Sequence, residues 1–469
     1  MLEQHIIDKF IAIVGPENVS VSNMDRLAYS YDATPQFQSM PDAVISVRHT
    51  QDVSDILKIC NEYKIPVVPR GSGTNLCAGT CPLEGGVVLT FRHMNKILEI
   101  DEENLTVTVQ AGAITLDIAH AVEAKGLFYP PDPSSMKIST IGGNINENSG
   151  GLRGLKYGVT RDYVIGLEIV LPNGDIIHTG GKLAKDVAGY DLTRLFVGSE
   201  GTLGIITEAI LKLVPMPETK KTMLALYEDI EDAARSVSKI IANKIIPTTL
   251  EFLDQPTIKV VEEFAQIGLP TDAKAVLLIE QDGAPEVVER DMKKMAEVCK
   301  QFHAVSVRVA KDEQEADALR TARRNALSAL ARLKPTTILE DATVPRSQVA
   351  AMVKAINEIA EQYNVHICTF GHAGDGNLHP TCPTDARNKD EIHRVEQAFA
   401  AIFEKAIELG GTITGEHGVG AMKAPYLELK LGRAGIEAMK SLKHAFDPNG
   451  IMNPSKIFAK DSRKRVVVE

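Results

Sequence analysis

The sequence predicts an α+β protein of two or more domains. Its 469 residues exceed the length that one hydrophobic core normally serves. Segments with strand-like patterns and segments with helical spacing occur along the whole chain. The stretch Pro215-Met216-Pro217-Glu218 breaks this pattern and gives the best position for a domain boundary. We therefore expect a first domain over 1–217, a second domain over 218–420 and a closing segment over 421–469.

Composition and charge exclude nucleic-acid-binding proteins. Hydrophobic residues make up 44% of the sequence and charged residues 24%, which is ordinary for a soluble globular chain. The net charge of -11 argues against nucleic acid as the main partner, because phosphate binding needs a clustered basic surface. The markedly basic run at 460–465 is expected to be a frayed end of the chain.

The sequence also lacks the signals of a membrane or secreted protein. No apolar run is long enough for a membrane span. The first ten residues contain acids, and they are expected to form an amphipathic helix and not a signal peptide. Six cysteines in so long a chain do not form a disulfide framework, and there is no closely spaced series for an iron–sulfur cluster. We therefore expect a reduced, cytoplasmic protein.

The first domain is expected to combine short strands with helices. Apolar residues at helical spacing follow Thr50, a candidate helix cap. The other predicted elements are the strands 65–68 and 85–91, the hairpin 97–112, the helix 115–126 and the hairpin 164–180.

Three glycine-rich segments interrupt this first domain. Residues 69–82 follow a strand but run into another strand, so they do not match the helix-opening loop of a Rossmann fold. Residues 139–158 hold too many glycines and asparagines for a packed helix or a central strand. A third cluster occupies 198–204. One such loop alone fits a plain surface loop equally well, but three together predict a long ligand, such as a dinucleotide, held by backbone N–H groups.

The second domain is expected to contain an antiparallel sheet with helices on one face, because strand and helix patterns are mixed along it. The strands are expected over 222–229, 275–282 and 304–310, and helices over 230–242, 319–333 and, in the closing segment, 432–446.

The stretch GHAGDGNLH, residues 371–379, carries a candidate metal site. Asp375-Gly376 predicts a tight two-residue turn, which would set His372 directly opposite His379 with Cβ atoms about 5 Å apart. Glu416, in the segment GEHG, is a candidate third ligand. Two imidazoles and one carboxylate with open positions fit a catalytic Zn, Mn or Fe ion. The alternative is that the histidines only satisfy backbone groups of a glycine-rich hairpin.

Several motifs together resemble one family. PRGSGTNL, PPDPSS, TIGGNINENSGG, YGVTRDYVIGLEIV and LFVGSEGTLGIIT resemble, in this order, the FAD-binding half of the vanillyl-alcohol oxidase superfamily. GHAGDGNLHP, GEHGVG and FDPNGIMNP narrow the resemblance to the branch that contains the glycolate oxidase flavoprotein subunit, D-lactate dehydrogenases and D-2-hydroxyglutarate dehydrogenase. The resemblance covers nearly the whole chain. It implies a two-subdomain FAD-binding fold, a ferredoxin-like capping domain and a C-terminal helical segment that returns to the FAD domain.

The resemblance also implies which residues line the cofactor channel. The pyrophosphate would be held by residues 70–75 and 142–148. The full set of expected cofactor-binding residues is Pro69, Arg70, Gly71, Ser72, Gly73, Thr74, Asn75, Gly79, Pro131, Asp132, Ser134, Thr140, Gly142, Gly143, Asn144, Asn148, Gly150, Gly151, Tyr157, Asp162, Glu200, Gly201, Gly204, Ile205, Ile206 and Asn453. Relatives that tether the flavin covalently use a histidine where this chain has Thr74, so we expect non-covalent FAD.

The resemblance assigns roles in the substrate site as well. Arg323 falls where the family places an arginine that clamps the substrate carboxylate, and a guanidinium fork suits that group. Leu339 replaces a lysine that holds a second carboxylate in D-2-hydroxyglutarate dehydrogenases, which favours D-lactate or glycolate. With the ion on its three ligands, His417 would take the hydroxyl proton and the flavin would accept the hydride. Alternatively, His417 only orients Glu416.

The expected function is therefore oxidation of a small D-2-hydroxy acid, with electrons passed to a partner. That partner would be an iron–sulfur subunit, an electron-transferring flavoprotein or a quinone. One rival makes the chain the dehydrogenase subunit of an electron-bifurcating lactate dehydrogenase complex. The other rivals are a metal-dependent hydrolase that binds a nucleotide through its glycine loops, and a non-catalytic flavin scaffold.

Overall fold

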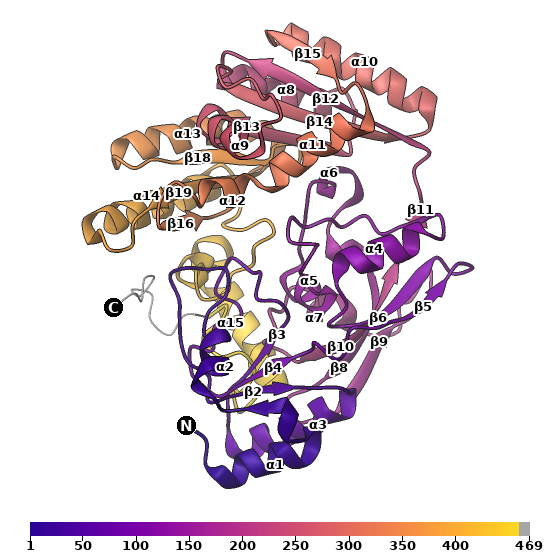
Figure 1. Ribbon diagram of the computed structural model, residues 1–469, viewed down its shortest axis with the longest axis vertical. Coiled ribbons are helices and arrows are strands. Elements are labelled where there is room, and N and C mark those ends of the chain that lie inside the picture. Colours follow the sequence, from indigo (N-terminus) through magenta and orange to yellow (C-terminus); the bar gives the residue numbers. More distant parts are fainter. Residues whose placement is uncertain (459–469) are drawn as a thin grey trace. The chain divides into compact units, whose positions relative to one another are not determined.

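The computed structural model describes residues 1–458, which form two compact units (Figure 1). Unit 1 comprises 1–149, 159–216 and the chain from Glu416 onward, and unit 2 comprises 150–158 and 217–415. The chain enters unit 2 after Met216, where we predicted a junction after Pro217. It re-enters unit 1 at Glu416, ahead of the predicted start of the closing segment. The basic run at 460–465 lies outside the described residues.

Two sheets form the framework of unit 1. In the first sheet, of order β1-β2-β4-β3, the strands β2, β4 and β3 are parallel and β1 is antiparallel. The second sheet, of order β5-β6-β10-β8-β9, is antiparallel throughout. The strands are β1 (Val19–Ser20), β2 (Ala43–Ser46), β3 (Val67–Arg70), β4 (Val87–Thr90), β5 (Ile97–Asp101), β6 (Thr106–Gln110), β8 (Val164–Val170), β9 (Ile176–Gly180) and β10 (Ile205–Lys212), with the separate pair β7 (Leu127–Phe128) and β11 (Val214–Pro215).

The helices of unit 1 alternate with these strands along the sequence. They are α1 (Gln4–Val14), α2 (Asn23–Ala28), α3 (Thr50–Tyr63), α4 (Thr115–Glu123), α5 (Ile141–Glu147), α7 (Leu192–Phe196) and α15 (Leu427–Phe446). Phe10 of α1 and Ile56 of α3 share one core with Ile45 and Leu89 of the parallel strands. The amphipathic N-terminal helix predicted from the sequence is therefore confirmed.

The glycine-rich segment 139–158 departs from its prediction, because α5 is a helix. Thr140 caps it by accepting a hydrogen bond from the Gly143 amide at 3.4 Å. A Cβ on Gly142 would lie only 2.8 Å from the Cβ of Ala111, the residue after β6. Glycine at this position therefore lets the helix pack closely against the end of β6. Close packing outweighs the low helix propensity of glycine.

The end of the described chain belongs to the framework of unit 1. After α15, Met452 forms a parallel bridge with Val67, and the Asn453 amide donates to the Val67 carbonyl at 2.8 Å. Residues 451–453 thus extend the parallel sheet at the edge of β3. The element α15 is broken at Gly432, where φ is 65°, and the helix expected over 432–446 corresponds to the part after this break.

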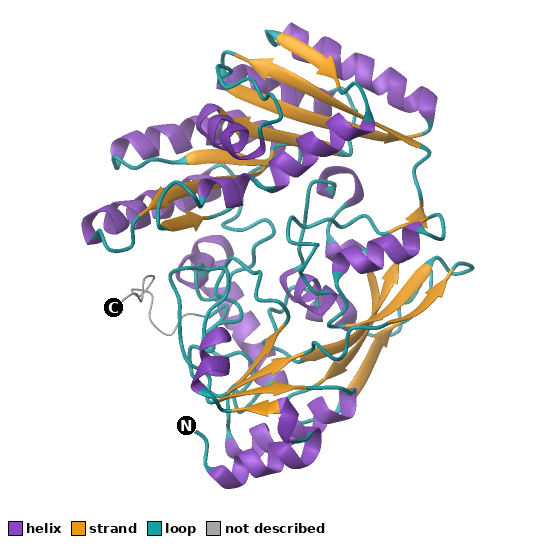
Figure 2. Cartoon of the chain, viewed as in Figure 1, coloured by secondary structure: helices purple, strands orange, loops and turns teal. Residues whose placement is uncertain are grey.

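Unit 2 is built on one large antiparallel sheet of order β15-β12-β14-β13-β18-β19-β16, with β17 beside β19 (Figure 2). Its first four strands have the ferredoxin-like order that the resemblance implied. The strands are β12 (Thr219–Tyr227), β13 (Thr249–Asp254), β14 (Ala275–Gly283), β15 (Ser306–Val309), β16 (Thr336–Leu339), β17 (Ala342–Thr343), β18 (Cys368–His372) and β19 (Asn377–Thr384). The helices are α6 (Gly154–Tyr157), α8 (Ile230–Ala242), α9 (Gln255–Ala265), α10 (Pro285–Gln301), α11 (Glu313–Arg324), α12 (Ala326–Leu330), α13 (Val349–Gln362) and α14 (Lys389–Glu408).

Helices cover both faces of this sheet, so the prediction of a single helical face is wrong. Tyr227 of β12 donates a hydrogen bond to Ser236 of α8. Leu224, on the opposite face of the same strand, packs with Ile258 of α9 and Leu319 of α11. The residues of β13 are buried in succession, as expected for a strand covered on both sides.

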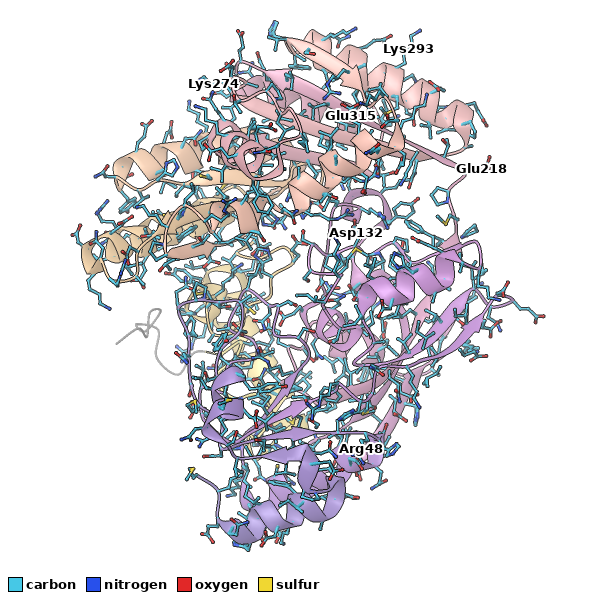
Figure 3. All side chains as sticks on the ribbon, in the orientation of Figure 1. Arg48, Asp132, Glu218, Lys274, Lys293 and Glu315 are labelled. Carbon is cyan, nitrogen blue, oxygen red and sulfur yellow. The ribbon has the colours of Figure 1, made fainter. Side chains whose placement is uncertain are left out.

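The outer helices of unit 2 follow simple amphipathic patterns. In α10, Met292 and Met295 are buried while Lys293 is exposed, and Figure 3 shows Lys293 among the side chains on the outside of the unit. The long helix expected over 319–333 is two helices, α11 and α12, which meet at Asn325. Within residues 1–458, no helix combines the length and the hydropathy that a membrane crossing requires.

Candidate functional site

The hairpin β18–β19 carries both candidate metal-binding histidines. His372 pairs with Asn377, and His379 pairs with Phe370. The connection 373–376 is held by the amides of Asp375 and Gly376, which both donate to the His372 carbonyl. The predicted register, with His372 directly opposite His379, is therefore wrong. Two-residue I′ and II′ turns both need positive φ at the first central residue, and here Gly376 has positive φ while Asp375 does not.

The two histidines nevertheless lie side by side. They are diagonal neighbours across the hairpin, and diagonal neighbours point to the same face of a sheet. Their ring centroids are 5.1 Å apart and the rings are nearly perpendicular, at 88°. Both side chains are buried. Two adjacent buried imidazoles form a donor set that fits a divalent ion such as Zn, Mn or Fe.

A carboxylate that was not predicted from the sequence lies within hydrogen-bond distance of His372. Glu251 of β13 lies 121 positions away in the sequence, and its Oε1 is 2.7 Å from the Nδ1 of His372. Its side chain is only 1% exposed. Burial alone would raise the pKa of the Glu251 carboxyl, but the neighbouring Arg323 and His372 bring this pKa below its ordinary value. The available signal was a glutamate between two apolar residues, Leu250 and Phe252, of a strand-like pattern.

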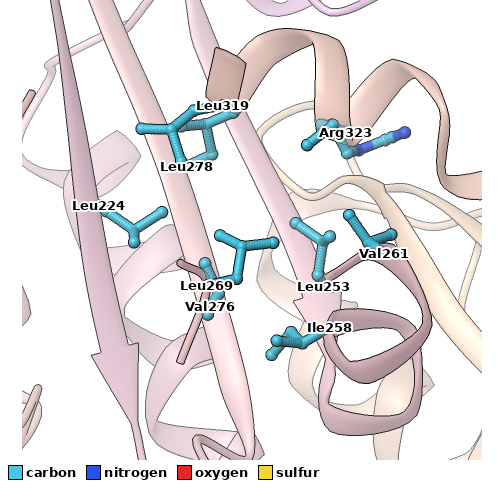
Figure 4. Close-up of a pocket in the computed structure, with 10 residues that line it drawn as sticks. Leu224, Leu253, Ile258, Val261, Leu269, Val276, Leu278, Leu319 and Arg323 are labelled. Atoms are coloured by element: carbon cyan, nitrogen blue, oxygen red, sulfur yellow. The ribbon is translucent and has the colours of Figure 1, made fainter. Parts of the chain in front are cut away.

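Arg323 lies on the other side of this carboxylate. Its Nη2 is 2.6 Å from Glu251 Oε2, and its side chain is 3% exposed. The guanidinium also lies 4.8 Å from the ring centre of Phe370, the strand partner of His379. Figure 4 shows Arg323 at the edge of a small apolar pocket, with its guanidinium pointing away from Leu253 and Leu278.

The chain leaves unit 2 beside the histidine hairpin. The Gly415 amide donates to Asp341 Oδ2 at 2.7 Å. A Cβ on Gly415 would lie 2.7 Å from Cγ of Asn377, the strand partner of His372. Glu416, the next residue, therefore starts within one peptide unit of this contact. Glu416 and His417 themselves are assigned to unit 1.

Residues from each of the three glycine-rich segments come together in unit 1. A Cβ on Gly71 would lie 2.2 Å from Oγ1 of Thr140, which joins the first segment to the second. The Gly201 amide donates to Asn146 Oδ1 at 3.0 Å, which joins the second to the third. A Cβ on Gly201, where φ is 68°, would lie 2.5 Å from Cγ of Pro69. This convergence is what the hypothesis of one long ligand requires.

Asn453 closes this cluster from the far end of the chain. Its Nδ2 donates to the carbonyls of Gly79 at 2.9 Å and Glu200 at 2.7 Å. Its Oδ1 is buried and has no hydrogen-bond partner among residues 1–458. It thus offers an acceptor to a ligand in a cluster of backbone groups, which fits a dinucleotide.

Other expected cofactor residues shape the loops of unit 1. Asn75 accepts from the Gly79 amide, Asn144 donates to Thr115, and Asn148 accepts from the Arg161 amide. Arg70 is buried and donates to the Tyr31 carbonyl at 2.6 Å. The remaining buried members are Pro131, Asp132, Gly142, Gly204, Ile205 and Ile206, the half-buried ones are Gly73, Thr74 and Gly143, and the exposed ones are Ser72, Ser134 and Asp162.

Gly150, Gly151 and Tyr157 differ from the rest of the expected cofactor set, because they belong to unit 2. The Tyr157 hydroxyl donates to Asp282 Oδ2 at 2.9 Å, and Lys156 pairs with the same carboxylate. These bonds attach the segment 150–158 to Asp282 near the end of β14. Gly150 and Gly151 are part of this segment of unit 2.

A cluster of one thiol and two carboxyl groups beside the glycine segments was not predicted as a unit. Cys77, Glu147 and Glu200 hold their ligand-type atoms within 4.8 Å of one another. Burial raises the pKa of both carboxyls. Glu200 accepts from the amides of Val419 and Gly420 at 2.7 and 2.6 Å, which fastens the chain after Glu416 to this cluster.

The chain matches two family models that together cover most of its length. Residues 41–180 match the FAD binding domain, and residues 216–457 match the C-terminal domain of FAD linked oxidases. Solved structures agree in fold at low sequence identity. A p-cresol methylhydroxylase matches with a TM-score of 0.80 at 18% identity, covering 97% of this chain and 96% of that chain. An alkyldihydroxyacetonephosphate synthase gives 0.75 at 18%, with 97% and 86% covered.

Curated relatives match over nearly the full length. The glycolate oxidase subunit GlcD of Bacillus subtilis is 75% identical over all of both chains. A D-lactate dehydrogenase of Anaerostipes hadrus is 36% identical, with 96% of this chain and 97% of that protein covered. A D-2-hydroxyglutarate dehydrogenase of Stutzerimonas stutzeri is 34% identical, with 98% and 100% covered.

Proposed function

Because the chain belongs to the FAD-linked oxidase family, an FAD-dependent group of oxidoreductases, we propose that it oxidises D-lactate or glycolate to the 2-oxo acid. The observation that carries this proposal is the buried histidine pair of β18–β19, within a chain whose other unit has the FAD-binding fold. The relatives named above for glycolate and D-lactate support the choice of substrate.

The reaction needs a group that makes an alcohol acidic enough to lose its proton near neutral pH. A divalent ion supplies this when bound, because it lowers the pKa of a coordinated oxygen by several units. We assign His372, His379 and Glu416 as its ligands. His417, the residue after Glu416, takes the hydroxyl proton, since an imidazole is poised near working pH.

A small monocarboxylate suits the end of β16 better than a dicarboxylate does. Leu339 stands where the resemblance expects a lysine for a second carboxylate, and it is buried opposite Thr381 of β19. An apolar side chain there offers no hydrogen bond to such a group, and burying the unpaired charge would cost several kcal/mol. D-2-Hydroxyglutarate is therefore expected to be a poor substrate.

FAD is held by the cluster around Gly71, Thr140, Gly201 and Asn453, and it supplies the hydride acceptor when bound. The backbone amides of these segments would bind phosphate oxygens, because glycine leaves no side chain in the way. Thr74 lacks the nucleophilic imidazole of covalently flavinylated relatives, so the flavin is non-covalent. Acid precipitation should leave the colour in the supernatant; colour in the pellet would contradict this assignment.

The electrons of the oxidation pass to a separate acceptor, because the cysteines of this chain are not arranged for an iron–sulfur cluster. Cys60, Cys77 and Cys81 lie in unit 1 and the other three in unit 2, and all six are buried free thiols. Neither unit holds the four cysteines that an iron–sulfur cluster usually takes. The partner is an iron–sulfur subunit, an electron-transferring flavoprotein or a quinone. The alternative from the sequence, the dehydrogenase subunit of an electron-bifurcating lactate dehydrogenase complex, stays a second candidate.

Anaerobic titration of the purified yellow protein with 2-hydroxy acids tests the function. D-Lactate or glycolate should bleach the flavin and D-2-hydroxyglutarate should do so poorly. Colour without bleaching by any acid would indicate a flavin scaffold, and a colourless protein that cleaves nucleotides would indicate a hydrolase. His417→Asn should keep flavin and metal but slow bleaching by about 10²- to 10⁴-fold. Unchanged bleaching would place the base elsewhere.

A further inference from the structure

We propose that Asp341 positions Glu416, the proposed carboxylate ligand of the metal, by holding the backbone just before it. Asp341 follows β16 and is fully buried. Its Oδ2 accepts hydrogen bonds from the Gly415 amide at 2.7 Å and from the Thr414 hydroxyl at 3.2 Å. This inference rests on the proposed metal site, and in it Asp341 is a positioning residue that acts through Glu416.

The segment 412–415 lies beside the short strand β17. Thr412 and Thr343 exchange both of their backbone hydrogen bonds, at 2.8 and 3.2 Å. On its other side, β17 pairs with the start of β19, where Thr343 lies opposite Asn377. Asn377 is also the strand partner of His372. Strand β17 therefore links the segment 412–415 to the histidine hairpin.

The end of this segment fits closely against the same strands. A Cβ on Gly415 would lie 2.3 Å from Thr343 Oγ1 and 2.7 Å from Asn377 Cγ. The Thr343 hydroxyl donates to Asn377 Oδ1 at 2.8 Å, so these two side chains hold each other in place. A buried carboxylate requires hydrogen-bond donors, and Thr414 and Gly415 supply two of them to Asp341. These bonds therefore fix where the chain enters Glu416.

The chain on the other side of Glu416 is held separately, within unit 1. The amides of Val419 and Gly420 donate to Glu200 at 2.7 and 2.6 Å. The bond to Asp341 is made by the residue next to Glu416, whereas the bonds to Glu200 are made three and four residues further on. Each residue between an anchor and a side chain adds two rotatable backbone torsions. Asp341 is therefore the closer constraint on Glu416.

The test is a double-mutant cycle on Zn²⁺ affinity, measured in the flavin-loaded, metal-stripped protein by competition with a chelating dye. Asp341→Asn should raise the dissociation constant for Zn²⁺ about 10-fold or more. In the Glu416→Ala background, where the ligand is absent, the same substitution should have little further effect. Wild-type affinity of the Asp341→Asn protein, or equal weakening by Asp341→Asn in both backgrounds, would overturn the inference.

Asp291→Asn is the matched control for this substitution. Asp291 is a buried aspartate of α10 in the same unit, and its Oδ2 accepts from Gln281 of β14 at 3.0 Å. Its replacement should leave the dissociation constant for Zn²⁺ at the wild-type value. If Asp291→Asn weakens Zn²⁺ binding as much as Asp341→Asn does, the effect is a general one of losing a buried carboxylate, and the inference is wrong.

Gly415→Ala provides a second variant should Asp341→Asn fold poorly. It keeps the Asp341 carboxylate, but its Cβ must move the segment away from Thr343, so Zn²⁺ binding should again weaken only while Glu416 is present. Unchanged Zn²⁺ affinity in this variant would contradict the role of the segment. Wild-type Zn²⁺ affinity in His372→Ala would instead refute the proposed metal site itself, so the two failures can be distinguished.

Discussion

The candidate metal site and the candidate flavin site are built in opposite ways. The metal site uses side chains from one hairpin, His372 and His379, braced by the buried Glu251. The flavin site uses backbone groups of glycine-rich segments that lie far apart in the sequence and meet at Gly71, Gly201 and Asn453. The first site therefore depends on which side chains are present, and the second depends on which side chains are absent. Removing a side chain should therefore impair the metal site, and adding a side chain should impair the flavin site.

The largest expected effect comes from removing a side chain of the metal site. His372→Ala should lose the bound metal and reduce flavin bleaching by roughly 10³-fold or more, because the ion contributes several kcal/mol to the reaction. The ratio of FAD to protein should stay at the wild-type value. Metal analysis and stopped-flow absorbance provide these two readouts.

His393→Ala is the matched control for this variant, because His393 is an exposed residue of α14 in the same unit. It should behave as wild type in both measurements. An active, metal-free His372→Ala protein would show that the hairpin is not a metal site.

The next largest effect comes from adding a side chain to the flavin site. Gly201→Ala would place a Cβ 2.5 Å from Pro69 at a φ of 68°, so the first and third glycine segments must separate. We expect the purified variant to lose most of its FAD while it keeps its metal. The ratio of flavin absorbance to protein absorbance measures the loss.

Gly126→Ala separates the steric effect from backbone strain. Gly126 has nearly the same φ, 71°, but a Cβ there meets nothing within 4 Å. Both variants carry the strain of an alanine at positive φ, about 1 kcal/mol, and Gly126→Ala should retain its FAD. If the two variants lose FAD equally, the close approach of the segments is not what holds the cofactor.

This difference in construction also explains what the sequence could predict. The Asp375-Gly376 turn signal placed His372 and His379 on one hairpin, although the turn and the register differ from the prediction. Glu251 was missed because its partner is 121 positions away and no local pattern connects them. The helix α5 was missed because its formation depends on packing of Gly142 against Ala111, which no local propensity expresses.

The smallest expected effect concerns a second buried carboxylate on the same strand. Asp254 ends β13 and caps α9 through Thr257, without a cation beside it. Burial raises the pKa of Asp254 to about 6, whereas the cations beside Glu251 lower the pKa of that carboxyl. Burial therefore decides the direction of the pKa shift at Asp254, and neighbouring charge decides it at Glu251.

The sign of the pH effect follows from the raised pKa. Folded Asp254 holds its proton more tightly than the unfolded chain does, at a pKa of about 3.9. Its contribution to stability is full below about pH 4 and is lost as the pH rises through 6, by roughly 2–3 kcal/mol. Asp254→Asn should flatten the dependence of the unfolding free energy on pH between 4 and 7.

Urea unfolding at several pH values measures this slope. Asp312→Asn removes an exposed N-cap carboxylate of α11 and should leave the slope as in wild type. A wild-type slope in Asp254→Asn would show that Asp254 does not titrate in this range.

The central claim is that oxidation of the hydroxy acid needs both a flavin and an ion on the β18–β19 hairpin. The most direct measurement is anaerobic bleaching of the flavin by D-lactate or glycolate before and after removal of bound metal, at constant FAD content. We predict rapid bleaching of the metal-loaded protein, little in the stripped protein, and recovery when Zn²⁺ or Mn²⁺ is returned. Equal bleaching with and without metal would contradict the claim.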